Sequence, residues 1–208
     1  MKTSVSNRRG GAVIPTDSQI RAVLALAACG SFPERSIALV RLSVTLALRV
    51  GDLAGLQWRD VLDASGAVSG TLIIRPETAK YGSGCKLPVP AQVKKALEDL
   101  LASETKIHGV PSLTQPLFRS QRGYLTRQSM VMWFRRIYAA AGAKGCSSHS
   151  GRKFALNQMA RKISLAGGSI RDIQAIARHA SLQTTEKYLA VSPDAQSNVI
   201  SMLDKAIR

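Results

Sequence analysis

The sequence has few acidic residues: 13 Asp and Glu stand against 29 Lys and Arg in 208 residues, which gives a formal net charge of +16. So large an excess of one sign costs self-repulsion and is typical of proteins that bind a polyanion, most often nucleic acid. Aromatic residues are also scarce, at 5%, which disfavours binding of single strands by base stacking. The composition therefore favours contact with the backbone of double-stranded DNA. Binding to a membrane surface is disfavoured, because no predicted helix is both strongly basic and strongly amphipathic.

Cysteines are few and scattered, at Cys29, Cys85 and Cys146, with no Cys-x-x-Cys pair. This usage indicates a reducing compartment and excludes a disulfide framework. Cys146 lies three residues before His149, but one cysteine and one histidine do not make a zinc site, so no metal is expected. No run approaches the ~18 apolar residues that a membrane span needs. The first 11 residues also lack the apolar core of a secretory signal.

Hydrophobic periodicity predicts a mainly α protein with one small antiparallel sheet, an α+β class. The two strands are expected over 71–75 and 85–89, joined by a polar turn. Residues 1–15 are expected to form a flexible basic arm, 16–192 one domain, and 193–208 an amphipathic C-terminal helix. Helices are predicted at 16–29, 34–49, 52–56, 91–103, 126–141, 148–162, 169–178, 181–190 and 193–207.

Two of the three histidines lie near the end of the chain, where His149-x-x-Arg152 opens a predicted helix. A spacing of three residues places both side chains on one helix face. Ser147 and Ser148 are candidate caps for that helix, whose N-terminal amides then point at the same place. Imidazole, guanidinium and amides together predict an anion site. Taken alone the motif is weak, because His-x-x-Arg is common on protein surfaces.

Four further residues each have a functional and a structural interpretation. Arg49 follows an apolar run, so it is either a second guanidinium for the same anion or a cap for helix C-terminal carbonyls. Asp52 either orients a catalytic side chain or caps a helix. Lys80 lies in the polar turn between the strands, where it is either solvated charge or a proton donor whose pKa cationic neighbours lower. Lys86, on the returning strand, is the rival for that role.

Tyr188 lies nine residues after His179 on the last part of the predicted domain. A single helical tyrosine is normally a core residue with its hydroxyl at the surface. Because the free phenol has a pKa of about 10, it becomes a nucleophile only where cations or a base help to remove its proton.

Taken together and in order, these residues resemble the catalytic domain of the tyrosine recombinase (phage integrase) family. Thr45–Asp60 resembles the first box of that family, with an arginine, an acidic residue and a Leu-x-Trp-x-Asp tail. Glu77–Lys80 with Leu87–Pro90 resembles its lysine hairpin. Ser148–Ala155 resembles the second box, and Ile173–Tyr188 the last box with the nucleophile.

The resemblance implies DNA strand transesterification through a 3′-phosphotyrosyl link, without metal, cofactor or ATP. Tyr188 is then the nucleophile, and His149 the acid/base for its proton. The other residues that the resemblance assigns to catalysis are Arg49 and Arg152 as the phosphate clamp, His179 as a hydrogen bond to a phosphate oxygen, Lys80 as the proton donor to the leaving 5′-hydroxyl, and Asp52 in support.

Three features depart from the family pattern, one of them a slightly longer region around Gly167 and Gly168. Arg178 stands where the family usually has glycine, and with Lys86 and Lys153 it is a candidate DNA contact. The family usually adds an N-terminal domain that closes a clamp around DNA, and the chain holds no segment for it. We therefore expect either a small recombinase like the fimbrial phase-variation enzymes or an isolated catalytic domain.

The implied partner is double-stranded DNA in the cytoplasm, with nucleoid association when bound and no membrane. The implied assembly is a homo-tetramer on the DNA synapse and a monomer or weak oligomer when free. The 193–208 helix either docks on a neighbouring protomer or packs on its own core. Two rival functions remain open: a type IB topoisomerase-like relaxation of DNA, and a non-catalytic DNA-binding regulator that retains the fold.

Overall fold

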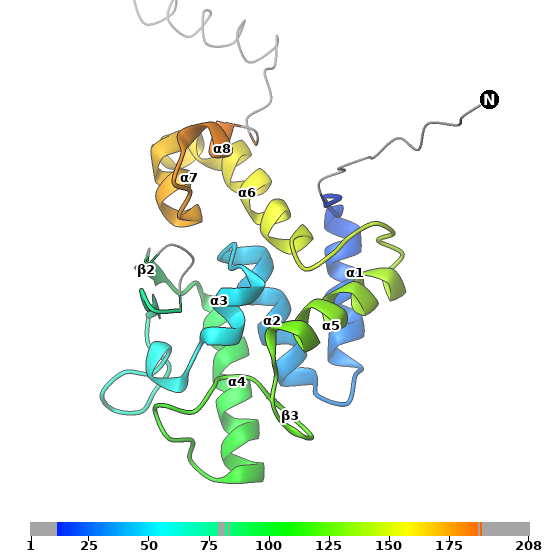
Figure 1. Ribbon diagram of the computed structural model, residues 1–208, viewed down its shortest axis with the longest axis vertical. Helices are drawn as coiled ribbons and strands as arrows, with labels where there is room; N and C mark the ends of the chain where they lie inside the picture. Colours follow the sequence, from blue (N-terminus) through cyan, green and yellow to red (C-terminus); the bar gives the residue numbers. More distant parts are fainter. Residues whose placement is uncertain (1–11, 79–81, 83, 187, 189–208) are drawn as a thin grey trace, which may run out of the picture. The chain divides into compact units, whose positions relative to one another are not determined.

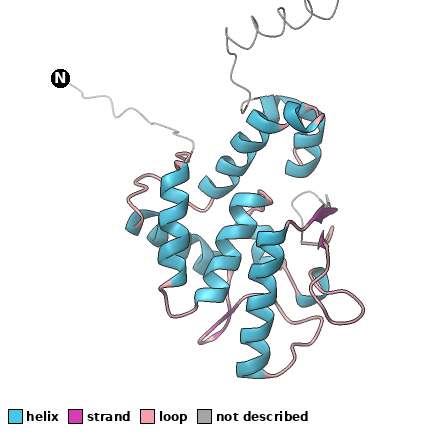
Figure 2. Cartoon of the chain, turned by 180° about the vertical axis from the view of Figure 1, so that it is seen from behind, coloured by secondary structure: helices cyan, strands magenta, loops and turns pink. Residues whose placement is uncertain are grey.

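Helices make up most of the structure, a computed structural model that describes residues 12–78, 82, 84–186 and 188. Only two short antiparallel pairs of strands accompany the helices among these residues (Figures 1 and 2). The predicted α+β class is thereby confirmed. The chain divides into two compact units, Met1–Ala155 and Leu156–Arg208.

The first unit is built around a buried helix, α2 (Pro33–Thr45), which packs against α1 (Asp17–Ala28) and α4 (Ala91–His108). Seven of its 13 residues are buried, as expected for a helix covered on several sides. The other elements of this unit are α3 (Val50–Gly55), the short 3₁₀-helix η1 (Trp58–Asp60), β1 (Thr71–Ile74), β2 (Cys85–Pro88), β3 (Arg119–Ser120), β4 (Gly123–Tyr124), α5 (Arg127–Ala140) and the start of α6 (Ser150–Lys162).

The predicted helix over 34–49 is wrong at its C-terminal end. α2 ends at Thr45, and Ala47 takes a left-handed conformation with φ 53°. Arg49 then has extended backbone and is the N-cap residue of α3 instead of the last residue of α2. The apolar run hides this break because Leu46, Ala47 and Leu48 are all buried. Hydrophobicity therefore continues through a point where the helix does not.

The main hairpin pairs the two strands that the sequence predicts, β1 with β2. Leu72 faces Leu87 across the β1–β2 pair, and both side chains are buried. Lys86 faces Ile73 on the opposite, exposed side. The second hairpin, β3–β4, was not predicted. Its two-residue strands are too short for any alternation of apolar and polar residues to show.

The second unit contains the rest of α6, the 3₁₀-helix η3 (Ser164–Ala166), α7 (Ile170–Ala177) and α8 (Leu182–Glu186), with α7 packed on α8. α7 ends in a Schellman motif. His179 N donates to Gln174 O at 3.1 Å, and Arg178 N donates to Ala175 O at 3.1 Å. Arg178 occupies the left-handed position of this motif, at φ 52° and ψ 50°.

The predicted helix over 193–207 and the hairpin turn at Lys80 lie outside the described residues. Across the part of the chain that the structure describes, no helix is both long enough and apolar enough to span a membrane.

Replacing Arg178 by glycine should stabilise the turn that carries His179. A side chain in the left-handed region destabilises the folded state by about 1–2 kcal/mol. Glycine removes this destabilisation but also has more backbone entropy in the unfolded chain, so we expect a net stabilisation of about 0.5–1 kcal/mol. Native-state hydrogen exchange of the Arg178 and His179 amides measures it. Arg178→Ala is the matched control, because it removes the guanidinium but keeps the strained Cβ. Equal protection in the two variants would contradict the prediction.

Candidate active site

One hydrogen bond joins the second predicted box to the first. The Arg152 guanidinium donates from Nη1 to the carbonyl of Ala47, in the connection between α2 and α3. Arg152 is only 6% exposed and Ala47 is fully buried. The left-handed backbone of Ala47 lies two residues before Arg49. The same short connection therefore holds one candidate arginine and leads directly into the other.

Asp52 holds the backbone of Arg49. Its Oδ2 accepts from Arg49 N at 2.8 Å, and its side chain is buried. A carboxylate in the first turn also stabilises the positive N-terminal end of α3. The helix-cap interpretation of Asp52 is therefore the one that this bond supports, and through it Asp52 fixes the start of the element that presents half-buried Arg49.

His149 lies at the N-terminal cap position of α6, one residue before the helix begins at Ser150. Its carbonyl accepts from Lys153 N at 3.0 Å, and its own N–H donates to Ser147 Oγ at 3.4 Å. The predicted helix start at 148 is therefore two residues early, and the bond from His149 N–H to Ser147 Oγ lies before the first helical residue. His149 and Arg152 still share the first turn of the helix.

Cations surround the His149 imidazole. Its pKa is lowered from the ordinary value of 6.5 first by partial loss of hydration and then by the positive charges of Arg152, Arg49, Arg127 and Lys153. The side chain remains exposed to solvent. An exposed imidazole near these four cations is neutral at pH 7. The cations attract an anion to the same place.

Gly151 lets α6 approach the core closely. A Cβ at this position would overlap Ser43 Oγ on α2 and lie 2.9 Å from the Tyr138 hydroxyl on α5. Both hydroxyls are buried, with no hydrogen-bond partner among the described residues. The glycine between His149 and Arg152 is thus required by packing.

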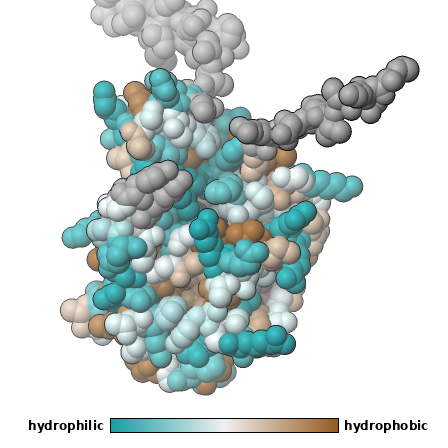
Figure 3. All heavy atoms as spheres, viewed as in Figure 1, coloured by the Kyte–Doolittle hydropathy of each residue, from teal (hydrophilic) through white to brown (hydrophobic). Residues whose placement is uncertain are grey.

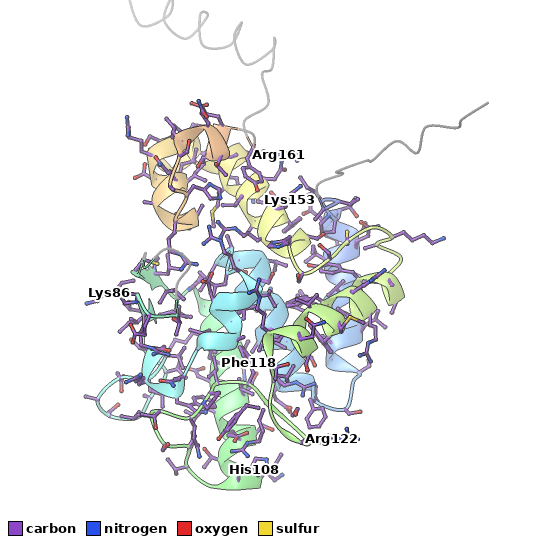
Figure 4. All side chains as sticks on the ribbon, viewed as in Figure 1. Lys86, His108, Phe118, Arg122, Lys153 and Arg161 are labelled. Carbon is purple, nitrogen blue, oxygen red and sulfur yellow. The ribbon has the colours of Figure 1, made fainter. Side chains whose placement is uncertain are left out.

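The β1–β2 hairpin is anchored at its base to the first box. Arg75 Nε forms an ion pair with buried Asp60 at 2.8 Å, and its Nη2 donates to Gly55 O at 2.8 Å. Lys80, in the turn of this hairpin, lies outside the described residues. Lys86 is exposed on β2, where it is labelled in Figure 4.

The second unit brings together His179 and Tyr188. Their rings are stacked, with centroids 6.2 Å apart and planes 13° from parallel. His179 Nδ1 lies 2.9 Å from Thr185 Oγ1, and Tyr188 N donates to Thr185 O at 3.0 Å. Both rings are half-buried.

The candidate DNA contacts differ in their surroundings. Lys153, labelled in Figure 4, donates from Nζ to Ala12 O at 2.9 Å, so its ammonium already has a backbone partner. Arg178 is half-buried in its left-handed turn. Hydrophilic residues cover much of the face drawn in Figure 3, with apolar residues scattered among them.

Within the described ranges no group of three or more His, Cys, Asp or Glu side chains is placed to hold a metal ion. Arg127 at the start of α5 adds positive charge around His149 and was not predicted from the sequence. Thr185 was not predicted either. Nothing in sequence spacing reveals Arg127, because only packing of α5 brings it near a residue 22 positions later.

The sequence matches the model of a known family. The model of the phage integrase family matches residues 16–194. The chain therefore belongs to the phage integrase family of tyrosine recombinases. Among curated proteins, it is 30% identical over 161 residues to tyrosine recombinase XerC of Pelobacter propionicus, with 76% of this chain and 47% of that protein covered. The chain spans about half the length of the curated relatives it matches.

Solved structures show the same fold. The XerA recombinase aligns with a TM-score of 0.69 at 21% identity, covering 96% of this chain and 66% of that one. The Tn1549 transposon integrase, in complex with a circular intermediate DNA, aligns with a TM-score of 0.74 at 18% identity, covering 95% and 68%.

Gly151→Ala should destabilise the first unit by about 1–3 kcal/mol, because the added methyl overpacks the contact with Ser43 and Tyr138. Ser43→Ala in the same chain removes the overlapping hydroxyl, so the double variant should recover more than half of the loss. Urea unfolding measures both. Gly51→Ala is the control, since a Cβ there meets nothing within 4 Å. An additive double variant would contradict the proposed clash.

The pKa of His149 should lie below 6.5 in the free protein, as NMR titration of its ring will measure. Arg152→Gln should raise this pKa more than Lys153→Gln does, because Arg152 is the larger charge effect. Because the pKa of His149 is lower in the folded than in the unfolded chain, the unfolded chain binds the proton more readily. The free energy of unfolding is therefore highest above about pH 6.5 and decreases as the pH falls through the pKa of the folded state. A His149→Gln variant should lack this part of the pH dependence.

Proposed function

We propose that this chain is the catalytic part of a site-specific DNA recombinase of the integrase or invertase type, which cuts and rejoins duplex DNA through a 3′-phosphotyrosyl intermediate. The observation that carries the proposal is the convergence of Arg49, Arg152 and His149. Asp52 and the Ala47 carbonyl hold the two arginines, and both arginines add positive charge around His149. Two guanidinium groups beside an imidazole suit a phosphodiester, whose oxygens carry more charge in the transition state.

Tyr188 Oη attacks the scissile phosphorus, and its proton passes to His149. The bond from phosphorus to the 5′-oxygen breaks, and Lys80 protonates that oxygen. A neutral imidazole is the form that accepts a proton, and the low pKa of His149 keeps it in that form at pH 7. His179 donates a hydrogen bond to a phosphate oxygen. Because the phosphotyrosyl ester conserves the energy of the bond, the reverse attack by a 5′-hydroxyl rejoins the strand without ATP, metal or cofactor.

The rest of the assembly follows from the same proposal. The partner is double-stranded DNA in the cytoplasm, with Arg178, Lys86 and Lys153 as backbone contacts. Residues 16–192 form the catalytic domain and 1–15 a basic arm. Four protomers assemble on the synapse, and 193–208 is the segment proposed to dock on a neighbour. Electrostatic binding of this kind weakens as salt rises.

Covalent capture from a random pool tests the proposal without knowledge of the target site. The protein is incubated with nicked duplexes of random sequence, and SDS-resistant adducts are recovered and sequenced. We expect wild type to enrich one duplex sequence, because cleavage of a phosphodiester close to the nick releases a short strand with a 5′-hydroxyl and traps the 3′-phosphotyrosyl link. Tyr188→Phe should give no adduct, since only the nucleophilic oxygen is removed.

Arg152→Ala separates catalysis from binding. It should reduce the single-turnover cleavage rate by at least about 100-fold, typical of removing a group that stabilises the transition state, while affinity for the captured duplex changes far less. A mainly affinity defect would contradict the role of Arg152. Adducts without sequence enrichment, together with relaxation of any supercoiled plasmid, would favour the topoisomerase-like rival. Sequence-specific binding with no adduct would favour the regulator.

A further inference from the structure

One residue, Gln174, hydrogen-bonds both the N–H and the carbonyl of His179. His179 N donates to Gln174 O at 3.1 Å, and Gln174 Nε2 donates back to His179 O at 3.1 Å. The turn is further defined by the left-handed conformation of Arg178. With the main chain held in this way, the direction of each ring nitrogen depends only on the side-chain torsions of His179.

Thr185 provides the contact that sets those torsions. Its Oγ1 lies 2.9 Å from His179 Nδ1, and the residue is 1% exposed. A buried threonine is β-branched and has few allowed values of its first torsion, so its hydroxyl has few positions available. The carbonyl of Thr185 also accepts from Tyr188 N at 3.0 Å. One threonine therefore contacts the ring of His179 and the backbone of Tyr188, whose rings stack on each other.

We propose that Thr185 is the positioning residue of this unit: its hydroxyl holds Nδ1 of His179 and its carbonyl holds Tyr188, so that the imidazole presents Nε2–H while the tyrosine is kept beside it. The inference rests on the proposed function for the identity of the anion that Nε2–H meets.

The chemistry of the two partners explains why a hydroxyl is needed. A neutral imidazole has one donor and one acceptor nitrogen, and the contact at one nitrogen selects the tautomer. Phosphate oxygens only accept hydrogen bonds, so the nitrogen facing them must carry the proton. A threonine hydroxyl can donate to Nδ1 or accept from it. When Nε2–H faces a phosphate oxygen, Nδ1 is the acceptor nitrogen and the hydroxyl donates to it. An apolar side chain at position 185 removes the hydrogen bond at Nδ1 and the restraint that this bond places on the tautomer and the ring torsion.

Three variants test the inference. Thr185→Val keeps the branched shape but removes the hydroxyl, and Thr185→Ser keeps the hydroxyl but removes the methyl group. Thr184→Val is the matched control, because the same substitution falls on the exposed neighbouring threonine. The first measurement is the ¹⁵N chemical shifts of the His179 ring in the free protein at pH 8, which are simple to assign since the chain has three histidines. The second is the single-turnover rate of adduct formation on the duplex recovered by covalent capture.

Wild type, Thr185→Ser and Thr184→Val should all show the Nε2–H pattern of shifts. Thr185→Val should move both ring nitrogens toward the averaged values of a tautomer mixture. Its cleavage rate should fall roughly threefold to tenfold, the usual effect of one neutral hydrogen bond, with DNA affinity unchanged. Thermal unfolding of each variant reports whether it still folds; if Thr185→Val does not fold, the comparison of Thr185→Ser with wild type decides.

Unchanged ring shifts in folded Thr185→Val would overturn the inference, as would Thr185→Ser that matches Thr185→Val in shifts and rate. Both results mean that the hydroxyl does not orient the ring. Failure of the proposed function has a different signature: wild type forms no adduct with any duplex, while the ring shifts still respond to Thr185→Val. The ring shifts and the adduct therefore report on the two claims separately.

Discussion

The hydrogen bond from Arg152 to the Ala47 carbonyl is the interaction on which the first unit's candidate site depends. It requires the helix break between α2 and α3, because only the left-handed turn at Ala47 leaves that carbonyl outside a helix. It also requires Gly151, since a larger residue would lift α6 from Ser43 and Tyr138. The same break makes Arg49 the start of α3, with Asp52 as its cap. One local irregularity therefore organises both arginines.

In the second unit, backbone and side-chain contacts position the candidate residues His179 and Tyr188. These two residues are exposed enough to react, so their positions cannot come from burial of the rings themselves. Buried Thr185 and the Schellman motif at Arg178 supply the fixed points. In both units a non-glycine residue with positive φ precedes a candidate catalytic residue by one or two positions. Such strain persists only where surrounding contacts over-determine it, and it is concentrated at functional sites.

Several elements were predictable because their signals are local. The capping box at Thr16 and Gln19 marks the start of α1, and both of its bonds are present. The β-branched run at Thr71–Ile74 pairs as expected with Cys85–Pro88. The end of α2 was not predictable, because hydrophobicity reports burial and not backbone conformation. The β3–β4 hairpin was missed because strands of two residues are too short to show an alternation of apolar and polar side chains. Arg127 was missed because His149 lies 22 residues later, and Thr185 because its contact with His179 spans six residues, a spacing that no helix or strand pattern encodes.

The sequence by itself determined the excess of positive charge, the helical class and the family, because these depend on composition and on the order of motifs along the chain. It also supplied the residue types that tyrosine-mediated transesterification of DNA needs, in the order that the family uses. Only the tertiary structure decided that Asp52 caps α3 at Arg49, that Arg152 reaches Ala47, and that Thr185 joins His179 to Tyr188. The last two are contacts between different elements, and hydrogen bonds act over about 3 Å. Such a distance is set by how helices pack and where they break, and spacing along the chain does not contain it.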